Sequence, residues 1–123
     1  MVKVLFDTNI LIDYLNGVAE AEQEIGRYRE KAISLITWME VIAGATENDE
    51  PLIKAFLSQF ELLPIDNNVS AEAVSIRRSR RIKLPDAIVL ASARLQNRLL
   101  ITRNTKNFPA GMDADVRMPY RYP

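Results

Sequence analysis

Short apolar runs alternate along the chain with stretches whose apolar residues recur at helical spacing. The runs are rich in branched aliphatic residues and have few polar positions, as expected of strands buried on both faces. The predicted strands are 2–6, 32–36, 62–65, 98–102 and a short one near 116–118. The predicted helices are 9–15, 19–30, 38–46, 50–60, 69–82 and 86–96. This alternation favours an α/β fold with a parallel sheet and right-handed crossovers.

Local residues place the starts of three helices. Asp7 ends the first strand and precedes the apolar stripe of the first helix. Thr37 and Glu40 fit a capping box, with the threonine at the N-cap and the glutamate in the first turn. Pro85 suits the first helical position because its missing N–H would be unpaired there anyway, and Asp86 follows it. Acidic residues are therefore predicted at the starts of three separate helices.

The strand-to-helix junctions of a parallel sheet emerge on one edge, so we expect Asp7, Glu40 and Asp86 to lie close together. Grouped carboxylates repel one another without a cation, which indicates a bound divalent metal. Each acid alone is also explained as a helix cap or a first-turn charge. The metal hypothesis therefore rests on the three together. A fourth junction, after strand 98–102, delivers Asn104 instead of an acid.

The composition narrows the chemistry. The chain has 123 residues, enough for one domain with a core, and it contains no histidine and no cysteine. Catalysis by a Ser-His-Asp triad, a Cys-His pair or a pair of histidines is excluded, as are His-rich zinc sites and disulfides. The absence of cysteine fits a reducing cytoplasm. No run approaches the roughly 20 apolar residues that cross a bilayer, and we expect no signal peptide at the N-terminus.

A net charge of zero hides a strong asymmetry. Residues 1–66 hold 5 Lys/Arg and 12 Asp/Glu, whereas residues 67–123 hold 11 and 4. An excess of positive charge in one half points to an anionic partner. The densest basic segment lies just before Asp86 and consists of Arg77, Arg78, Arg80, Arg81 and Lys83. We interpret it as a contact surface for phosphate groups, with a solvated helix face as the alternative.

Four motifs in order resemble the PIN-domain nucleases, and most of all the VapC-type toxins of bacterial and archaeal toxin–antitoxin pairs. They are DTNILIDYL at 7–15, the glutamate within SLITWMEV, Pro85-Asp86 within LPDAIVLASA, and TRNTKNF at 102–108. The resemblance covers essentially the whole chain. It implies a single PIN domain over 1–123, a three-layer α/β/α sandwich around a mainly parallel sheet of four to five strands.

The resemblance also implies roles for individual residues. Asp7, Glu40 and Asp86 stand at the family's acidic positions, with Asp7 and Asp86 as ligands of Mg²⁺ or Mn²⁺ and Glu40 acting partly through water. The implied supporting residues are Thr8, Asn9, Thr102 and Asn104. The clearest departure lies in 102–108, where Asn104 and Asn107 replace acids that many members have. The lost charge is expected to weaken a second metal site more than a first, with Asp113 or Asp115 as candidates to replace it.

The implied activity is metal-dependent hydrolysis of RNA, leaving a 5′-phosphate and a 3′-hydroxyl. VapC-like proteins are typically homodimers, each inhibited by a small cognate antitoxin that often inserts a side chain into the acidic pocket. Exposed hydrophobic residues of segments 19–30 and 38–60 are candidates for antitoxin docking. In the other interpretation, Trp38, Phe56 and Phe60 belong to the core.

Three alternatives remain open from the sequence. A catalytically weak or inactive PIN fold that only binds RNA or protein is suggested by Asn104 and Asn107. A phosphatase of the haloacid dehalogenase type also begins with an Asp after the first strand, but it needs a second acid where this chain has Asn9. A flap- or DNA-directed nuclease shares the acidic chemistry but usually has a larger chain.

Overall fold

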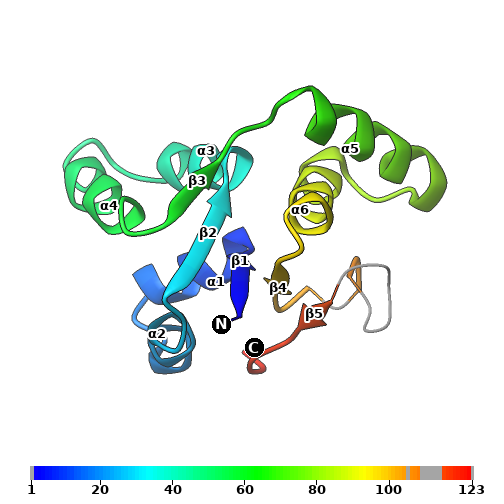
Figure 1. Ribbon diagram of the computed structural model, residues 1–123. Helices are drawn as coiled ribbons and strands as arrows, with labels where there is room; N and C mark the ends of the chain where they lie inside the picture. Colours follow the sequence, from blue (N-terminus) through cyan, green and yellow to red (C-terminus); the bar gives the residue numbers. More distant parts are fainter. Residues whose placement is uncertain (1, 105, 109–114, 123) are drawn as a thin grey trace.

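The computed structural model describes residues 2–104, 106–108 and 115–122. Its centre is a sheet of five parallel strands in the order β3-β2-β1-β4-β5 (Figure 1). The strands are β1 (Lys3–Phe6), β2 (Glu30–Ser34), β3 (Glu61–Leu63), β4 (Leu99–Ile101) and β5 (Val116–Arg117). The helices are α1 (Thr8–Leu15), α2 (Ala19–Gly26), α3 (Leu35–Ala43), α4 (Glu50–Leu57), α5 (Asn67–Arg80) and α6 (Leu84–Leu95).

The strand order places a topological switch point at β1. The chain adds β2 and β3 on one side of β1 and then returns to add β4 and β5 on the other side. In open parallel sheets, ligands bind beyond the carboxyl ends of the strands at such a point. The fold therefore makes the end of β1, where Asp7 stands, the expected position of a site.

Two apolar cores cover the two faces of the sheet, because successive strand residues point to opposite sides. Leu5 packs with buried residues of α5 and α6, whereas Val4 and Phe6 pack with residues of α1 and α2. Figure 1 shows α5 and α6 on one side of the sheet, with α1 and α2 on the other. The predicted three-layer α/β/α architecture is confirmed.

The start of α3 corrects the sequence prediction. Ser34 is the N-cap, and its hydroxyl accepts a hydrogen bond of 3.2 Å from the backbone N–H of Ile36. The predicted capping box of Thr37 and Glu40 is therefore wrong, and Glu40 lies in the second turn. The last residue of β2 is itself a good capping residue, so the strand turns directly into the helix. The preceding strand also starts earlier than predicted, because Glu30 pairs in register with Lys3 of β1.

Two other boundaries also differ from the sequence prediction. Helix α5 begins after Asp66, whose side chain accepts a hydrogen bond from Val69 N, and ends at Arg81 in the left-handed conformation (φ 58°). Helix α6 begins at Leu84, so Pro85 holds the second position, where a backbone N–H would also lack a partner within the helix. The described part of the chain contains no helix long and apolar enough to span a membrane.

Candidate active site

The three predicted acids meet at the carboxyl edge of the sheet. Asp7 follows β1, Glu40 projects from α3, and Asp86 lies in the first turn of α6. All three line one pocket of about 350 Å³. The other lining residues are Thr8, Asn9, Ile12, Arg103 and Asn104. The structure therefore brings together residues that lie as far apart as positions 7 and 104 in the sequence.

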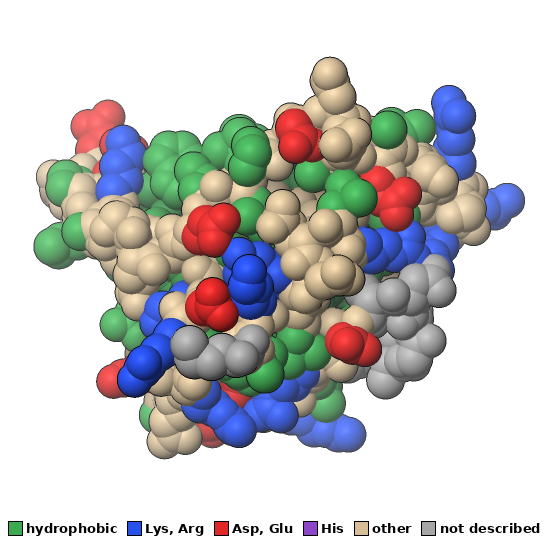
Figure 2. Space-filling view, viewed as in Figure 1, with side chains coloured by type: hydrophobic (Ala, Val, Ile, Leu, Met, Phe, Trp, Pro, Cys, Tyr) green, Lys and Arg blue, Asp and Glu red, His purple; other side chains and the backbone are tan. Residues whose placement is uncertain are grey.

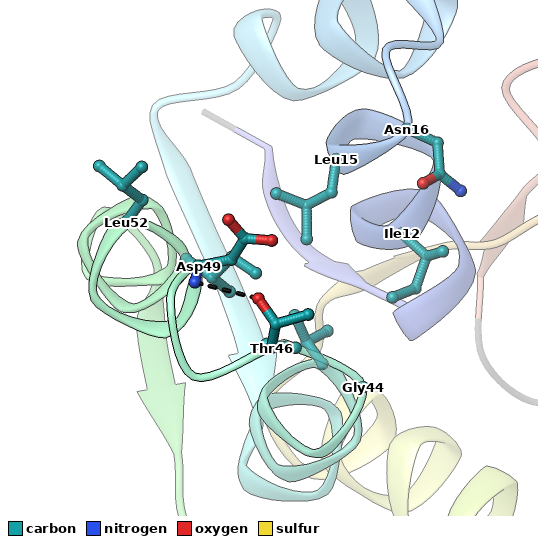
Figure 3. Close-up of a pocket in the computed structure, with 10 residues that line it drawn as sticks. Ile12, Leu15, Asn16, Gly44, Thr46, Asp49 and Leu52 are labelled. Carbon is teal, nitrogen blue, oxygen red and sulfur yellow. Dashed lines mark hydrogen bonds between the residues drawn. The ribbon is translucent and has the colours of Figure 1, made fainter.

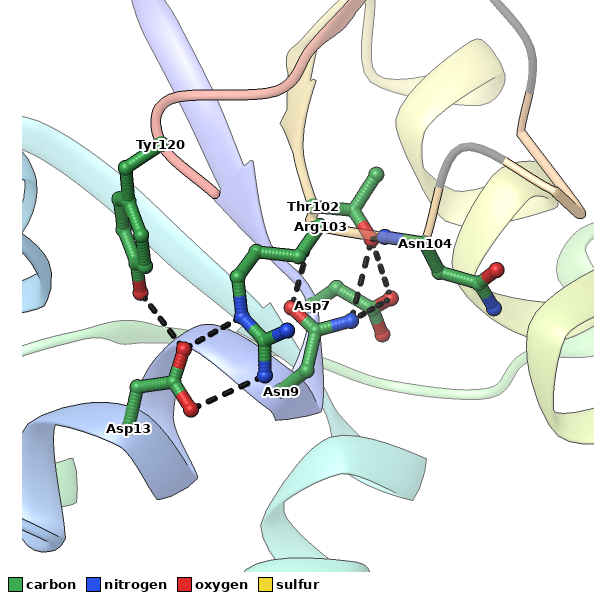
Figure 4. A network of polar contacts seen from close by, with 7 residues as sticks. All are labelled: Asp7, Asn9, Asp13, Thr102, Arg103, Asn104 and Tyr120. Carbon is green, nitrogen blue, oxygen red and sulfur yellow. Dashed lines mark hydrogen bonds and ion pairs between the residues drawn. The ribbon is translucent and has the colours of Figure 1, made fainter. Parts of the chain in front are cut away.

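Asp7 is the buried member of the group, with 5% of its surface exposed. Its Oδ1 accepts a hydrogen bond from Thr8 N at 2.8 Å, as an N-cap does. Its Oδ2 accepts bonds from Thr102 Oγ1 at 2.8 Å and Asn9 Nδ2 at 3.2 Å (Figure 4). Burial raises the pKa of this carboxyl to about 6, and the negative charges of Asp86 and Glu40 add to the increase against the lowering effect of these hydrogen bonds.

Thr102 and Asn9 join the end of β4 to the start of α1. Thr102 Oγ1 accepts bonds from Asn9 Nδ2 and from the backbone N–H of Asn104, and Asn9 Oδ1 accepts from Arg103 N at 3.2 Å. These contacts appear as a connected network in Figure 4. The network fixes the orientation of the Asp7 carboxylate. Of the predicted supporting residues, Thr8, Asn9 and Thr102 bond to Asp7 directly, whereas Asn104 reaches it through Thr102.

Glu40 is exposed, and the hydroxyl of Thr8 orients it by donating a hydrogen bond of 2.7 Å to Oε1. The Thr8 hydroxyl also lies 3.1 Å from that of the buried Thr37. The Thr8 hydroxyl has a single proton and donates it to Glu40. Thr8 Oγ1 therefore accepts a hydrogen bond from the hydroxyl of Thr37. Thr37, predicted as a cap, instead positions the threonine that holds the glutamate.

Asn107 was not assigned a role from the sequence, yet it contacts an acid directly. Its side-chain amide donates a hydrogen bond of 2.7 Å to Asp86 Oδ2, and its backbone N–H donates to Asn104 Oδ1 at 3.3 Å. An ionised aspartate at position 107 would repel Asp86 instead of donating to it. The TRNTKNF motif contained this signal, because an amide at position 107 can donate a hydrogen bond that an ionised carboxylate cannot.

Asp115, one of the two candidates to replace the charge missing at Asn104, does not line the acidic pocket. Its carbonyl accepts a hydrogen bond from Leu100 N at the amino end of β5, whereas the pocket lies at the carboxyl ends of the strands. Asp113 lies outside the described residues.

The donors in this pocket suit a hard divalent cation. Asp7 and Asp86 supply carboxylates, and Asn104 supplies a neutral amide oxygen. Burial raises the pKa of Asp7, and the neighbouring charges of Asp86 and Glu40 raise it further. No group of three or more acidic side chains in the described residues is arranged to hold a metal ion by itself. Magnesium needs only one or two direct carboxylates because it keeps several waters, so the donor set fits a partly hydrated ion.

The basic segment lies apart from this pocket. Arg77, Arg78 and Arg80 occupy the last turn of α5, where positive charge also stabilises the helix dipole, and Arg81 and Lys83 follow in the connection to α6. Lys and Arg side chains stand at the rim of the molecule near this end of α5 (Figure 2). None of the five lines the acidic pocket. Their contact with phosphate stays a prediction.

A buried charged cluster beside the pocket escaped the sequence analysis. Asp13 is 3% exposed and forms two contacts with the guanidinium of Arg103, one of them at 3.0 Å. The Tyr120 hydroxyl also donates to Asp13, at 2.9 Å (Figure 4). Burial, followed by the bond to Asp13, raises the pKa of Tyr120. Arg103 is thus anchored by Asp13, and Arg94 pairs with Glu72 at 3.3 Å.

An apolar pocket of about 470 Å³ lies next to the acidic one, between α1, α3 and α4 (Figure 3). Ile12 lines both pockets. Leu52, 75% exposed, and Leu15 and Ile53 contribute to its wall. By contrast, Phe60 is buried in the core, and Phe56 stacks on Tyr14 with ring centroids 4.3 Å apart.

Comparison with known proteins identifies the family of this chain. The PIN domain family matches residues 4–110. Ribonuclease VapC1 of Methanocaldococcus jannaschii is 32% identical over 86% of this chain and 79% of its own length. Ribonuclease VapC10 of Mycobacterium tuberculosis is 29% identical over 98% of this chain and 95% of its own length. A toxin–antitoxin complex from Klebsiella pneumoniae contains a chain that is 45% identical, with a TM-score of 0.91 over 98% of this chain and 100% of the other.

The fold and the acidic pocket define a PIN-type nuclease. The chain belongs to the PIN-domain family and, within it, to the VapC ribonucleases. The resemblance drawn from the sequence is therefore confirmed, and so is the prediction of a toxin ribonuclease. That one domain fills the whole of 1–123 stays a prediction.

Proposed function

We propose that this protein cleaves RNA with the help of Mg²⁺ or Mn²⁺. One observation carries the proposal: three carboxylates from separate elements line one pocket at the switch point of the sheet. The burial of Asp7 and the crowding of charge around it both favour binding of a cation. With no histidine or cysteine in the chain, carboxylates are left as the acid–base groups of this pocket.

Each acid has a distinct task in this proposal. Asp7 and Asp86 hold the ion directly, and Glu40 acts on it partly through water. A bound divalent ion lowers the pKa of a water molecule and neutralises charge on the phosphate. Glu40, exposed and oriented by Thr8, takes the proton from the attacking water. Water adds to phosphorus as the P–O3′ bond breaks, so the products end in a 5′-phosphate and a 3′-hydroxyl.

Incubation of the protein with total RNA tests this assignment. Wild type is compared with Asp7→Asn and Asp86→Asn in Mg²⁺, in Mn²⁺ and in a chelator. Asp115→Asn is the matched control, because it removes an exposed carboxylate that does not line the acidic pocket. We expect metal-dependent cleavage by wild type and the control only. Equal cleavage by all four proteins would overturn the proposal.

The alternative of an inactive binding module is suggested by the amides at Asn104 and Asn107. It predicts RNA binding that survives Asp7→Asn and no metal-dependent cleavage by any variant. The same incubation, followed by a binding measurement on the uncleaved RNA, distinguishes the two functions.

We also propose that a cognate antitoxin of the VapB type inhibits the enzyme from the apolar pocket. The 45% identical chain from Klebsiella pneumoniae was solved in a toxin–antitoxin complex. Because Ile12 lines both pockets, a segment bound in the apolar one would reach the carboxylates. We further propose that the protein is a homodimer acting in the cytoplasm, which a molar-mass measurement and fractionation of cells would test.

A further inference from the structure

A second polar pocket, distinct from the acidic one, borders it on the side of β5. Its volume is about 290 Å³, and its lining residues are Arg103, Met118, Tyr120, Arg121 and Tyr122. Arg103 follows β4 and the other four follow β5, so the pocket lies at the carboxyl edge of the sheet. Arg103 lines both pockets. The two pockets therefore adjoin at Arg103.

Asp13 holds this pocket in shape. Its buried carboxylate accepts hydrogen bonds from both Arg103 and Tyr120, which come from separate segments of the chain. The carbon at the centre of the Arg103 guanidinium lies 5.6 Å from the centroid of the Tyr122 ring, as in a cation–π contact. Asp13 of α1 therefore anchors two of the lining residues, Arg103 and Tyr120, although α1 itself does not line the pocket.

The chemistry of the opening is cationic and aromatic. Arg121 is exposed, and no carboxylate among the described residues forms an ion pair with it. The Tyr122 side chain is 45% exposed, so its ring is available to a ligand. Arginine guanidinium groups that meet phosphates, beside aromatic rings on which bases stack, are how proteins bind single-stranded nucleic acids.

We propose that this pocket binds a nucleotide of the RNA strand adjacent to the scissile phosphate. Arg121 contacts a phosphate, the ring of Tyr122 stacks on a base, and Arg103 joins this subsite to the carboxylates. The positive charges of Arg103 and Arg121 offset the repulsion between the RNA phosphates and the three carboxylates of the adjoining pocket. The subsite rests on the proposed ribonuclease function, since it assumes that a single RNA strand crosses the acidic pocket.

The test measures binding of fluorescent single-stranded RNA oligonucleotides to Asp7→Asn, which keeps the strand uncut. Adding Tyr122→Ala is expected to weaken binding by about five- to 150-fold, which corresponds to the loss of one base–aromatic stack. Tyr122→Phe keeps the ring and is expected to bind like the parent. Arg121→Ala is expected to weaken binding and to flatten its dependence on salt.

A pocket of similar composition supplies the matched control. Arg27, Tyr28 and Arg29 line it together with Val2, at the amino end of β2 and so at the opposite edge of the sheet. Arg29→Ala removes an exposed arginine there and is expected to leave binding unchanged. If Arg29→Ala weakens binding as much as Arg121→Ala does, the attraction is general and the subsite is overturned.

Cleavage by the same single variants separates the two proposals. Tyr122→Ala is expected to raise KM with little change in kcat, and an abasic nucleotide at one position of the substrate is expected to harm wild type but not this variant. If wild type cleaves RNA and Tyr122→Ala matches it in both KM and binding, the subsite falls while the ribonuclease stands. If wild type neither cleaves nor binds RNA, both proposals fall.

Discussion

The hydroxyl of Thr102, at the end of β4, donates a hydrogen bond of 2.8 Å to the carboxylate of Asp7, at the end of β1. The two residues are 95 positions apart, and the parallel pairing of the two strands brings them together. This bond lowers the pKa of Asp7 against the burial that raises it. Thr102 therefore keeps a buried acid in the ionised form that a cation requires.

Replacing Thr102 with valine removes the hydroxyl and keeps the shape of the side chain. We expect metal affinity and cleavage to fall by roughly ten- to hundredfold, as is typical when a residue that orients a ligand is lost. Titration with Mn²⁺ and cleavage assays measure the effect. Thr102→Ser is the control, because it retains the hydroxyl and should retain most of the activity. A Thr102→Val protein with unchanged metal affinity would contradict the role of this bond.

The raised pKa of Asp7 predicts how stability depends on pH. Because the carboxyl has a pKa of about 6 in the folded protein and 3.8 as the reference value, the folded state binds the proton more tightly. Ionisation of Asp7 therefore destabilises the folded state. The free energy of unfolding is unaffected at low pH, where the carboxyl is protonated in both states, and is about 3 kcal/mol lower once the pH exceeds 6. We expect Asp7→Asn to melt higher than wild type at pH 8 without metal, and this advantage to shrink toward pH 4.

Melting temperatures of both proteins across this pH range measure the difference. The contributions of all other titrating groups are common to the two proteins and cancel in this difference. Added Mg²⁺ or Mn²⁺ should raise the melting temperature of wild type more than that of Asp7→Asn. An advantage of the variant that grows as the pH falls would refute the assignment of the raised pKa to Asp7.

The sequence predicted the sheet and the three acids well, because both follow from short-range patterns. Apolar runs specify strands buried on both faces, and the parallel arrangement then brings Asp7, Glu40 and Asp86 to one edge. The capping box at Thr37 failed because Ser34 offers the same chemistry three residues earlier. Local propensity does not decide between two caps, since the choice depends on where strand pairing ends, and Ser34 still pairs with Leu63 of β3.

The cluster of Asp13, Arg103 and Tyr120 could not be predicted for a different reason. Arg103 and Tyr120 lie 90 and 107 positions after Asp13 in the sequence. Each of the three residues by itself resembles an ordinary surface residue of its segment. Only the packing of the C-terminal segment against α1 brings them into contact. The role of Asn107 could not be predicted for the same reason. Its side-chain amide donates a hydrogen bond to Asp86, and this contact is visible only in the folded structure.

The contact between Asn107 and Asp86 leads to a prediction about activity. Asn107→Ala removes the donor at 2.7 Å and leaves the Asp86 carboxylate without its orienting amide. We expect cleavage to fall by about ten- to hundredfold at limiting metal and to recover in part at high metal concentration. Asn68→Ala, at an exposed position of α5, is the matched control. Full activity of Asn107→Ala at limiting Mg²⁺ would show that Asp86 needs no such partner.

Asp13 is expected to matter for stability. Asp13→Asn leaves Arg103 without its charged partner and weakens the bond from Tyr120. Loss of one partner of a buried ion pair costs up to about 5 kcal/mol, and we expect about 2 kcal/mol because Arg103 keeps 24% of its side chain exposed. Urea unfolding measures this, with the exposed Asp49→Asn as control. Equal unfolding midpoints for the two variants would show that the cluster adds little.

Leu52 tests the surface assigned to the antitoxin. It is 75% exposed on α4 and lines the apolar pocket without contributing to the core, so Leu52→Asp should leave both folding and RNA cleavage intact. A charge placed in an apolar interface must be desolvated without a partner, so inhibition by the antitoxin should require a higher concentration. Val2→Asp, 58% exposed and outside the pocket, is the matched control. Titration of cleavage with the cognate antitoxin measures the effect, and identical inhibition curves for the two variants would show that the antitoxin docks elsewhere.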